Sequence, residues 1–185
     1  LALDTGYHTF TITDSHGCTL TDSVLISQPD SLSTIATTTN VLCNGGATGT
    51  AILTISGGTS PYSQNWGLFN PDSLSAGTYP YTVTDTNGCA FSDSAQVSEP
   101  NLLAVTLNNQ NVSCYDGANG KLSAIVTGGT SPFTYLWSNL DTNQTAETLV
   151  AGYYVVTVTD THACIVISDT MEITQPDSLY TTYTL

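Results

Sequence analysis

Short stretches in which apolar and hydroxyl-bearing residues alternate run along the whole chain. In the clearest of them Tyr79, Tyr81 and Val83 fall on one face of a strand, and Thr82 and Thr84 fall on the other. The same period-two pattern predicts strands at Ser33–Val41, Thr50–Ser56, Tyr62–Gly67, Thr78–Asp85 and Cys89–Ser98. One apolar and one polar face on each strand is typical of a β-sandwich.

Between these strands the sequence places turn residues. They are Gly57-Gly58, the irregular crossing Asn70–Ser75 and Thr86-Asn87-Gly88. The segment Leu74–Tyr79 resembles the tyrosine corner of immunoglobulin-like domains, in which a Tyr hydroxyl bonds the backbone just upstream. An earlier copy of the segment has His8 where Tyr79 stands.

The strand pattern repeats along the chain. Gly57–Tyr62 recurs as Gly128–Phe133, an offset of 71 residues, and Trp66 and Cys43 recur as Trp137 and Cys114 at the same offset. The hairpin phrase that ends at Cys89 has relatives that end at Cys18 and Cys164, and each repeat closes on Gln28-Pro29, Glu99-Pro100 or Gln175-Pro176. Self-similarity at a fixed period indicates a repeat architecture.

The repeats define the expected domain organisation. Residues 30–100 and 101–176 are two complete repeats, residues 1–29 are the C-terminal hairpin of a truncated repeat, and residues 177–185 are the first strand of a further one. The last hairpin follows at 75 residues instead of 71, and the polar residues Asn139–Thr148 hold the excess. We expect a surface loop there, because loops absorb insertions at little cost.

Composition agrees with small all-β domains. Lys, Arg, Glu and Met, the usual helix formers of exposed faces, are nearly missing. Fifteen acidic residues against one base, Lys121, give a formal charge of −14, which disfavours binding to nucleic acid and to anionic membranes. No apolar run approaches the roughly 18 residues of a membrane helix. His16 and His162 lie in hairpin turns where the middle repeat has Asn87, and the three His residues form no repeated arrangement with a Ser, Cys or carboxylate. We therefore expect no catalytic residues and no enzyme activity.

Taken together, these phrases resemble the SprB-type repeat of large surface adhesins in gliding Bacteroidota. The resemblance rests on a Cys before Gly-rich sequence, Gly-Gly-Thr-x-Pro-Tyr with a Trp, the Val-Thr-Asp hairpin that ends in Cys, and the Gln-Pro ending. It implies tandem small immunoglobulin-like or PKD-like β-sandwich repeats, displayed in long arrays on the cell surface and exported by type IX secretion. Ala163 for the hairpin Gly and Glu99 for Gln are departures from the pattern.

Two cysteines in each complete repeat of a secreted protein indicate disulfides. The simplest pairing lies within repeats, Cys43 with Cys89 and Cys114 with Cys164, and leaves Cys18 to a partner upstream. In an ordinary immunoglobulin topology, however, the loop after the first strand and the last hairpin lie at opposite ends. A bond would then join consecutive repeats, for example Cys43 with Cys164. We expect the bond within each repeat, because each domain has to be stable alone during export.

Two other kinds of site have structural alternatives. Asp85, Asp160 and the related Asp14 in the hairpins, and Asp116 in a Gly-rich loop, offer oxygens to Ca²⁺, but Asp also stabilises turns, which is the interpretation we favour. We therefore expect no cofactor. Trp66 and Trp137 could stack on sugars, but a strand Trp more often belongs to the core, and we expect the core.

One pattern concerns modification. Eleven of the twelve Asp residues precede Ser or Thr, and six of these pairs match the O-glycosylation sequon of Bacteroidota. The candidate acceptors are Ser23, Ser31, Ser73, Ser94, Thr170 and Ser178. The alternative is that Asp forms local hydrogen bonds with the residue that follows it.

The function expected from all this is mechanical and adhesive. We expect a secreted, outer-surface stalk or filament for attachment and for gliding, with an extracellular surface or polysaccharide and the neighbouring repeats as partners. A spacer or carbohydrate-binding module of an extracellular enzyme is the alternative.

Overall fold

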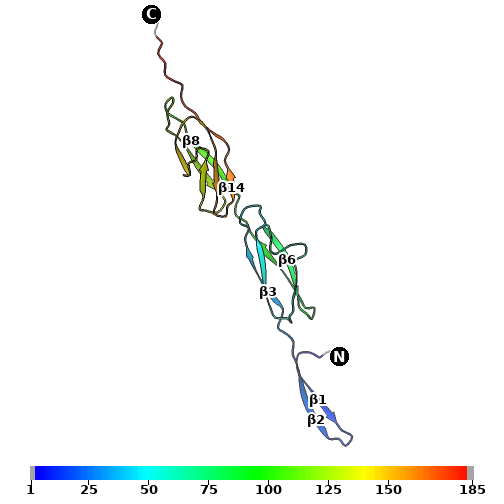
Figure 1. Ribbon diagram of the computed structural model, residues 1–185. Helices are drawn as coiled ribbons and strands as arrows, with labels where there is room; N and C mark the ends of the chain where they lie inside the picture. Colours follow the sequence, from blue (N-terminus) through cyan, green and yellow to red (C-terminus); the bar gives the residue numbers. More distant parts are fainter. Residues whose placement is uncertain (1–2, 183–185) are drawn as a thin grey trace. The chain divides into compact units, whose positions relative to one another are not determined.

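The computed structural model describes residues 3–182, and every regular element among them is a β-strand (Figure 1). The all-β fold class expected from the sequence is confirmed. No helix in the described part of the chain is long and apolar enough to cross a membrane. The strands are β1 (Gly6–Thr13), β2 (Thr19–Ile26), β3 (Ser33–Thr39), β4 (Thr50–Ser56), β5 (Ser63–Asn65), β6 (Gly77–Thr84), β7 (Ala90–Val97), β8 (Ala104–Gln110), β9 (Gly120–Thr127), β10 (Thr134–Trp137), β11 (Thr145–Leu149), β12 (Gly152–Tyr154), β13 (Val156–Thr159), β14 (Ile165–Ile167) and β15 (Met171–Ile173).

The strands form several small sheets, as stacked sandwich layers require. Within the described residues the orders are β1-β2, β3-β4, β5-β6-β7, β11-β9-β8, β12-β15 and β10-β13-β14. The pairings β8–β9, β10–β13 and β13–β14 are all antiparallel. β3 to β7 match the strands predicted for residues 30–100 to within two residues at each end, and only an isolated bridge, Gly49 to Leu74, marks the predicted irregular crossing.

By its contacts the chain divides into two compact units. Unit 1 comprises the described residues up to Thr37, with Ile52–Leu68 and Tyr79–Ala95, and unit 2 comprises Thr38–Ala51, Phe69–Thr78 and the described residues from Gln96 onward. The repeat boundaries drawn from the sequence stay a prediction. Residues 177–182 form no strand, and the end of the strand predicted for 177–185 lies outside the described residues.

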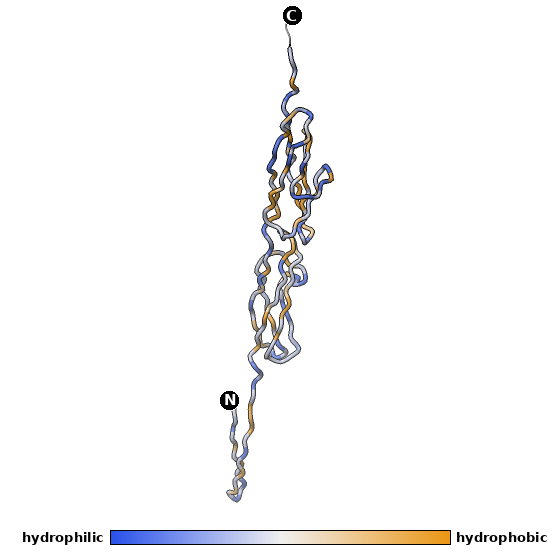
Figure 2. Tube along the Cα trace, turned by 90° about the vertical axis from the view of Figure 1, so that its left-hand side faces the viewer, coloured by the Kyte–Doolittle hydropathy of each residue, from blue (hydrophilic) through white to orange (hydrophobic). Residues whose placement is uncertain are grey.

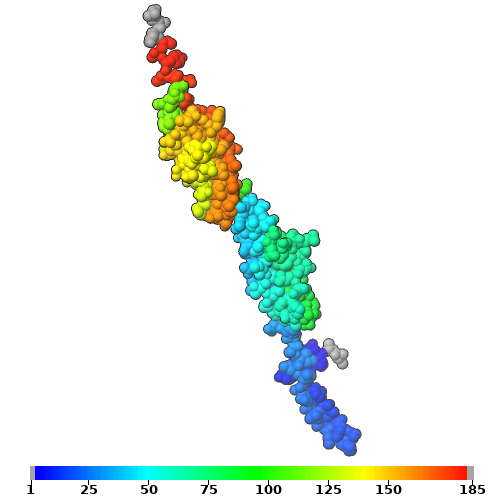
Figure 3. Space-filling view, viewed as in Figure 1, coloured from blue at the N-terminus to red at the C-terminus, as the bar shows by residue number. Residues whose placement is uncertain are grey.

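The core of unit 2 lies between the sheets of the last repeat, in the yellow to orange body of Figure 3. Its fully enclosed side chains come from alternate positions of the strands, which is why hydrophilic and hydrophobic residues alternate along the trace in Figure 2. The buried members are Val112, Leu122, Ala124, Trp137, Ala146, Leu149, Val156, Val158 and Ile173.

Unit 1 buries the equivalent aromatic residue in the same way. The ring centroids of Trp66 and Tyr81 lie 4.9 Å apart, and the Tyr81 and Thr34 hydroxyl oxygens lie 2.7 Å apart. Trp66 is 7% exposed and its counterpart Trp137 is 1% exposed. The prediction that both tryptophans belong to the core is confirmed.

The polar insertion of the last repeat is more than the surface loop expected from its sequence. Its end forms β11, which pairs with β9 and places Ala146 in the core. Lys121, the single base of the chain, lies on β9 and donates to Glu147 Oε1 of β11 at 2.7 Å. The insertion therefore adds an edge strand to the β8–β9 sheet.

The tyrosine corner is present, and a histidine reproduces it. Tyr154, the last repeat's counterpart of Tyr79, donates its hydroxyl proton to the Val150 carbonyl oxygen at 3.0 Å. His8 Nε2 donates to the Asp4 carbonyl oxygen at 2.6 Å, also four residues upstream. A ring N–H at this position thus makes the bond for which the sequence pattern uses a phenol.

Candidate functional site

Each Asp of the hairpin turns is the centre of a hydrogen-bond cluster. Asp160 Oδ1 accepts the backbone N–H groups of His162 at 2.8 Å and Cys164 at 2.9 Å, and its Oδ2 accepts that of Thr130 at 3.0 Å. The Asp160 N–H in turn donates to the Cys164 carbonyl oxygen. The carboxylate therefore fixes the hairpin turn, with its Cys, against the Gly-Gly-Thr turn.

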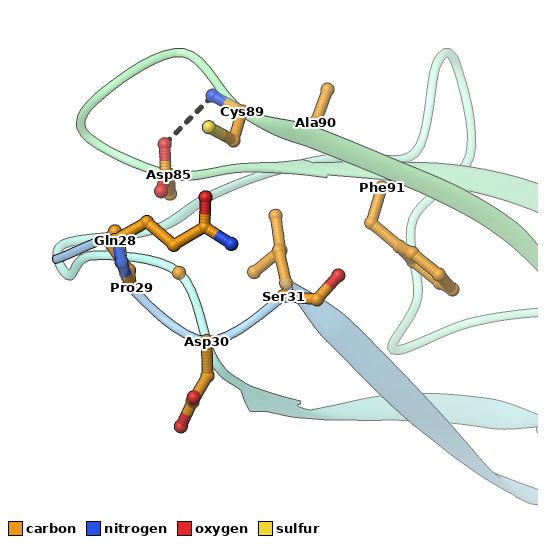
Figure 4. A pocket seen from close by; sticks show the side chains of 10 residues that line it. Gln28, Pro29, Asp30, Ser31, Asp85, Cys89, Ala90 and Phe91 are labelled. Carbon is orange, nitrogen blue, oxygen red and sulfur yellow. Dashed lines mark hydrogen bonds between the residues drawn. The ribbon is translucent and has the colours of Figure 1, made fainter. Parts of the chain in front are cut away.

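Asp85 repeats the arrangement in unit 1. Its carboxylate accepts the N–H groups of Thr59, Asn87 and Cys89, each at 2.9 Å, and the bond from Cys89 is drawn in Figure 4. Asp14 Oδ1 accepts the Cys18 N–H at the same distance. In all three hairpins an Asp carboxylate thus accepts the backbone N–H of the Cys four residues later.

The ionisation of these carboxylates follows from their surroundings. Burial works to raise the pKa of Asp160, but the N–H donors of Cys164, Thr130 and His162, and the charge of His162, outweigh it, so the pKa is lowered. The pKa of Asp85 is lowered by the same balance, with burial opposed by donors from Cys89, Thr59 and Asn87. Both carboxylates are therefore charged acceptors at neutral pH.

These contacts fit the turn interpretation of the Ca²⁺ candidates. The oxygens of Asp85 and Asp160 already accept backbone N–H groups. Asp116 sits at a φ of 55°, where its counterpart Gly45 has 75°, and donates its N–H to Gln175 Oε1 at 3.1 Å. Among residues 3–182 no three His, Cys, Asp or Glu side chains gather as metal ligands would.

The Gly-rich loop carries the other cysteine of each repeat, and the end of the same repeat braces it. Gly45 donates its N–H to Glu99 Oε2 at 2.6 Å, as Asp116 does to Gln175 in the next repeat. This contact gives the Glu or Gln before the closing Pro a structural role that sequence reasoning missed. A side chain also closes each loop from within: Thr48 Oγ1 accepts the Leu42 N–H, and Asn119 Oδ1 accepts the Ser113 N–H.

A disulfide in unit 2 joins the loop of one repeat to the hairpin of the next. Cys43 is bonded to Cys164, with the two Cα atoms 5.7 Å apart and a sequence separation of 121. Cys18, Cys89 and Cys114 are free and exposed. The within-repeat pairing expected from the sequence, Cys43 with Cys89 and Cys114 with Cys164, is therefore wrong.

The geometry of the last repeat explains the correction. Its Gly-rich loop immediately precedes β9, and the turn that bonds Asp160 immediately follows it. Eight strand residues span about 26 Å at roughly 3.3 Å each, whereas disulfide Cα atoms lie within about 7 Å. Cys114 and Cys164 thus lie at opposite ends of one domain. In the chain-entropy model the observed bond stabilises the folded state by about 5 kcal/mol.

A scan against protein families gives two matches to one family, one in each complete repeat. Residues 35–66 and 106–142 each match the model of the SprB repeat. The chain thus contains two segments that match the SprB repeat. The two matches begin 71 residues apart, the offset of the repeat, and each contains the loop cysteine, the Gly-Gly-Thr turn and the Trp of its copy. No curated protein matches the chain.

The match indicates the class of protein in which such repeats occur. SprB repeats are structural repeats of extracellular surface proteins and not an enzyme family. The match therefore indicates a repeat region of the kind found in surface adhesins. All six candidate glycosylation residues are exposed. The Asp partners of Ser23 and Ser94 accept those residues' backbone N–H groups, and the Ser73 hydroxyl donates to the Ala47 carbonyl oxygen at 3.0 Å.

Proposed function

We propose that these SprB repeats form part of the stalk of a secreted adhesin, displayed outside the outer membrane, which carries tension between the cell and the surface to which it attaches. The bond from Cys43 to Cys164 is the observation that carries the proposal. A force along the chain passes through this bond, so the residues between the two cysteines are shielded from extension while it holds. Such a connection suits a load-bearing array. Export by type IX secretion and use in gliding belong to the same proposal.

The mechanical part is tested by pulling single molecules from their two ends. In the reduced chain the segment between the cysteines, with its sequence separation of 121, contributes about 420 Å of extra contour length, at about 3.5 Å per residue. We expect the oxidised chain to stop short of full extension by that amount, and a Cys164→Ser variant to extend fully with or without reductant. Equal final lengths for the oxidised and reduced chains would contradict the proposal.

The adhesive part is tested in the cell that makes the chain. Residues 30–176 would be replaced by unrelated β-sandwich domains of equal total length. A stalk only holds the tip at a distance, so attachment should persist, and deletion without replacement should reduce it. Loss of attachment after replacement would show that the repeats themselves bind the ligand. The enclosed rings of Trp66 and Trp137 argue against sugar stacking at those positions.

We also propose that glycans cover the strand edges of this stalk. The acceptors would be the exposed hydroxyls of Ser23, Ser31, Ser73, Ser94, Thr170 and Ser178. Bulky glycans block edge-to-edge pairing between neighbouring chains, a hazard for long arrays of small sheets. Protein isolated from its native source should exceed the 19.4 kDa of the bare chain by discrete glycan masses at these residues. An intact mass equal to the polypeptide would contradict the proposal.

A further inference from the structure

The free hairpin cysteines have the same backbone setting as the bonded one. The Cys89 and Cys164 N–H groups donate to the first carboxylate oxygen of Asp85 and Asp160, each at 2.9 Å. In both hairpins the Asp N–H returns a bond to the Cys carbonyl oxygen. Cys89 therefore has the local geometry that positions Cys164 for its disulfide, but not the bond itself.

Beside Cys89 there is an open cavity, whereas in unit 2 the Gly-rich loop of Cys43 lies beside the corresponding Cys164. In unit 2, Cys43 and Asn44 share the lining of a cavity with Leu103, Ala163 and Cys164. In unit 1 the corresponding Leu32 and Cys89 line a cavity of about 420 Å³, whose lining contains no Gly-rich loop. Figure 4 shows the Cys89 sulfur on the side of the hairpin that faces Gln28.

The other partner of such a disulfide, a cysteine in a Gly-rich loop, is present at Cys114. Its loop is held as the loop of Cys43 is: the N–H three residues after each Cys donates to the Cys carbonyl oxygen, at 3.0 Å from Gly117 and at 2.9 Å from Gly46. Cys114 also lines a cavity of about 360 Å³ together with Pro176 and Leu179. Leu179 occupies the repeat position of Leu103, which lines the bonded junction.

We infer that the cavity at Cys89 binds the Gly-rich loop of a preceding SprB repeat, that the loop of Cys114 occupies the same cavity of a following repeat, and that a disulfide forms at each junction. This inference rests on the proposed stalk. The rule is that the loop cysteine of each repeat bonds the hairpin cysteine of the next, and Cys18 follows it as a hairpin cysteine. Each repeat is then bonded covalently to both neighbours in addition to the main chain.

Bond formation needs a two-electron oxidant of the disulfide class, such as oxidised glutathione. The thiolate of one cysteine attacks one sulfur of the oxidant and displaces a glutathione thiolate. The second cysteine, as thiolate, then attacks the mixed disulfide and displaces the other. Two protein thiols thus lose two protons and two electrons, and one oxidised glutathione becomes two molecules of reduced glutathione.

The test lengthens the chain by one repeat in register. Leu179 corresponds to Leu32, so Leu185 corresponds to Thr38 and a second copy of residues 39–100 is fused after Leu185. In this chain the original Cys89→Ser and a Ser in the appended copy of Cys43 make every cysteine peptide distinct. After refolding in a glutathione buffer, free thiols are alkylated and non-reduced peptides are mapped by mass spectrometry.

We expect two disulfides, Cys43 to Cys164 and Cys114 to the appended hairpin cysteine, with Cys18 alkylated. A matched chain with Ser in place of the appended hairpin cysteine should leave Cys114 alkylated. The bond from Cys43 to Cys164 reports folding and oxidation in the same molecule. If this bond forms and Cys114 is found alkylated, or if Cys114 bonds another cysteine, the inference is overturned. The proposed stalk is tested separately, by the replacement of residues 30–176 in cells.

Discussion

The two complete repeats bury the same tryptophan but treat its N–H group differently. Trp137 Nε1 donates to the Asn143 carbonyl oxygen at 2.8 Å, whereas Trp66 Nε1 is buried without a hydrogen-bond partner in the described structure. Asn143 belongs to the insertion that the middle repeat lacks. Four additional residues thus complete a polar contact that the shorter repeat leaves open, and they add an edge strand as well.

The comparison separates positions where a side chain can replace glycine from positions where a side chain would overlap the backbone. Both repeats keep Gly-Gly-Thr: a Cβ on Gly57 would overlap the Ser31 carbonyl oxygen, and one on Gly128 would overlap that of Leu102. At the hairpin tip, by contrast, Gly88 has open space around it, and the last repeat places Ala163 there at a φ of 64°. Sequence variation between the repeats follows the space available.

The largest expected loss of stability comes from substituting a glycine that both repeats share. Gly128→Ala places a Cβ against a backbone carbonyl at a φ of 68°, so we expect a loss of about 3 kcal/mol or more in the free energy of unfolding. Gly88→Ala, at a φ of 85° in open space, is the matched control and should cost about 1 kcal/mol. Chemical denaturation measures both, and equal losses would contradict the steric account.

A smaller effect should distinguish the two tryptophans. Trp137→Phe removes a satisfied hydrogen bond, whereas Trp66→Phe removes an N–H that is buried without a partner. Because the loss of indole volume is the same, we expect Trp137→Phe to destabilise by about 1–2 kcal/mol more than Trp66→Phe. Calorimetry of the two variants provides the comparison. A larger cost at Trp66 would show that its N–H has a partner in solution.

The smallest effect concerns the hairpins, where His162 stands in place of Asn87. Because the pKa of Asp160 is lowered on folding, its stabilisation is complete above the ordinary Asp pKa and is lost as pH falls through the folded value. The imidazolium of His162 contributes to that lowering. In the His162→Asn variant the melting temperature should therefore begin to fall at a higher pH as acid is added. The melting temperature at neutral pH should stay unchanged. Superimposable melting curves from pH 2 to 7 would contradict this.

The sequence alone was sufficient for the strands of residues 30–100 and for the apolar face of each, because both follow from local alternation. β4 begins and ends where the pattern placed it, and Tyr81 and Val83 are buried as their face predicted. The same pattern in the hairpin of β1 and β2 leaves Phe10 46% and Ile12 59% exposed. Alternation therefore predicts which face is apolar, and burial also requires a second layer.

The disulfide and β11 could not be read from local pattern. Pairing of Cys43 depends on which ends of which strands meet, and spacing leaves both the within-repeat and the between-repeat bond open. The sequence from Asn139 to Thr148 is polar enough for a loop, and only the edge of β9 that it meets makes its end a strand. The role of Glu99 was hidden because its partner, Gly45, lies 54 residues away.

The most direct test of the junction is the disulfide map of the 185-residue chain itself. Purified oxidised protein is alkylated, digested without reduction and analysed by mass spectrometry. The structure predicts one bond, between Cys43 and Cys164, with Cys18, Cys89 and Cys114 all alkylated. Bonds from Cys43 to Cys89 and from Cys114 to Cys164 would contradict it, because each repeat would then be closed on itself.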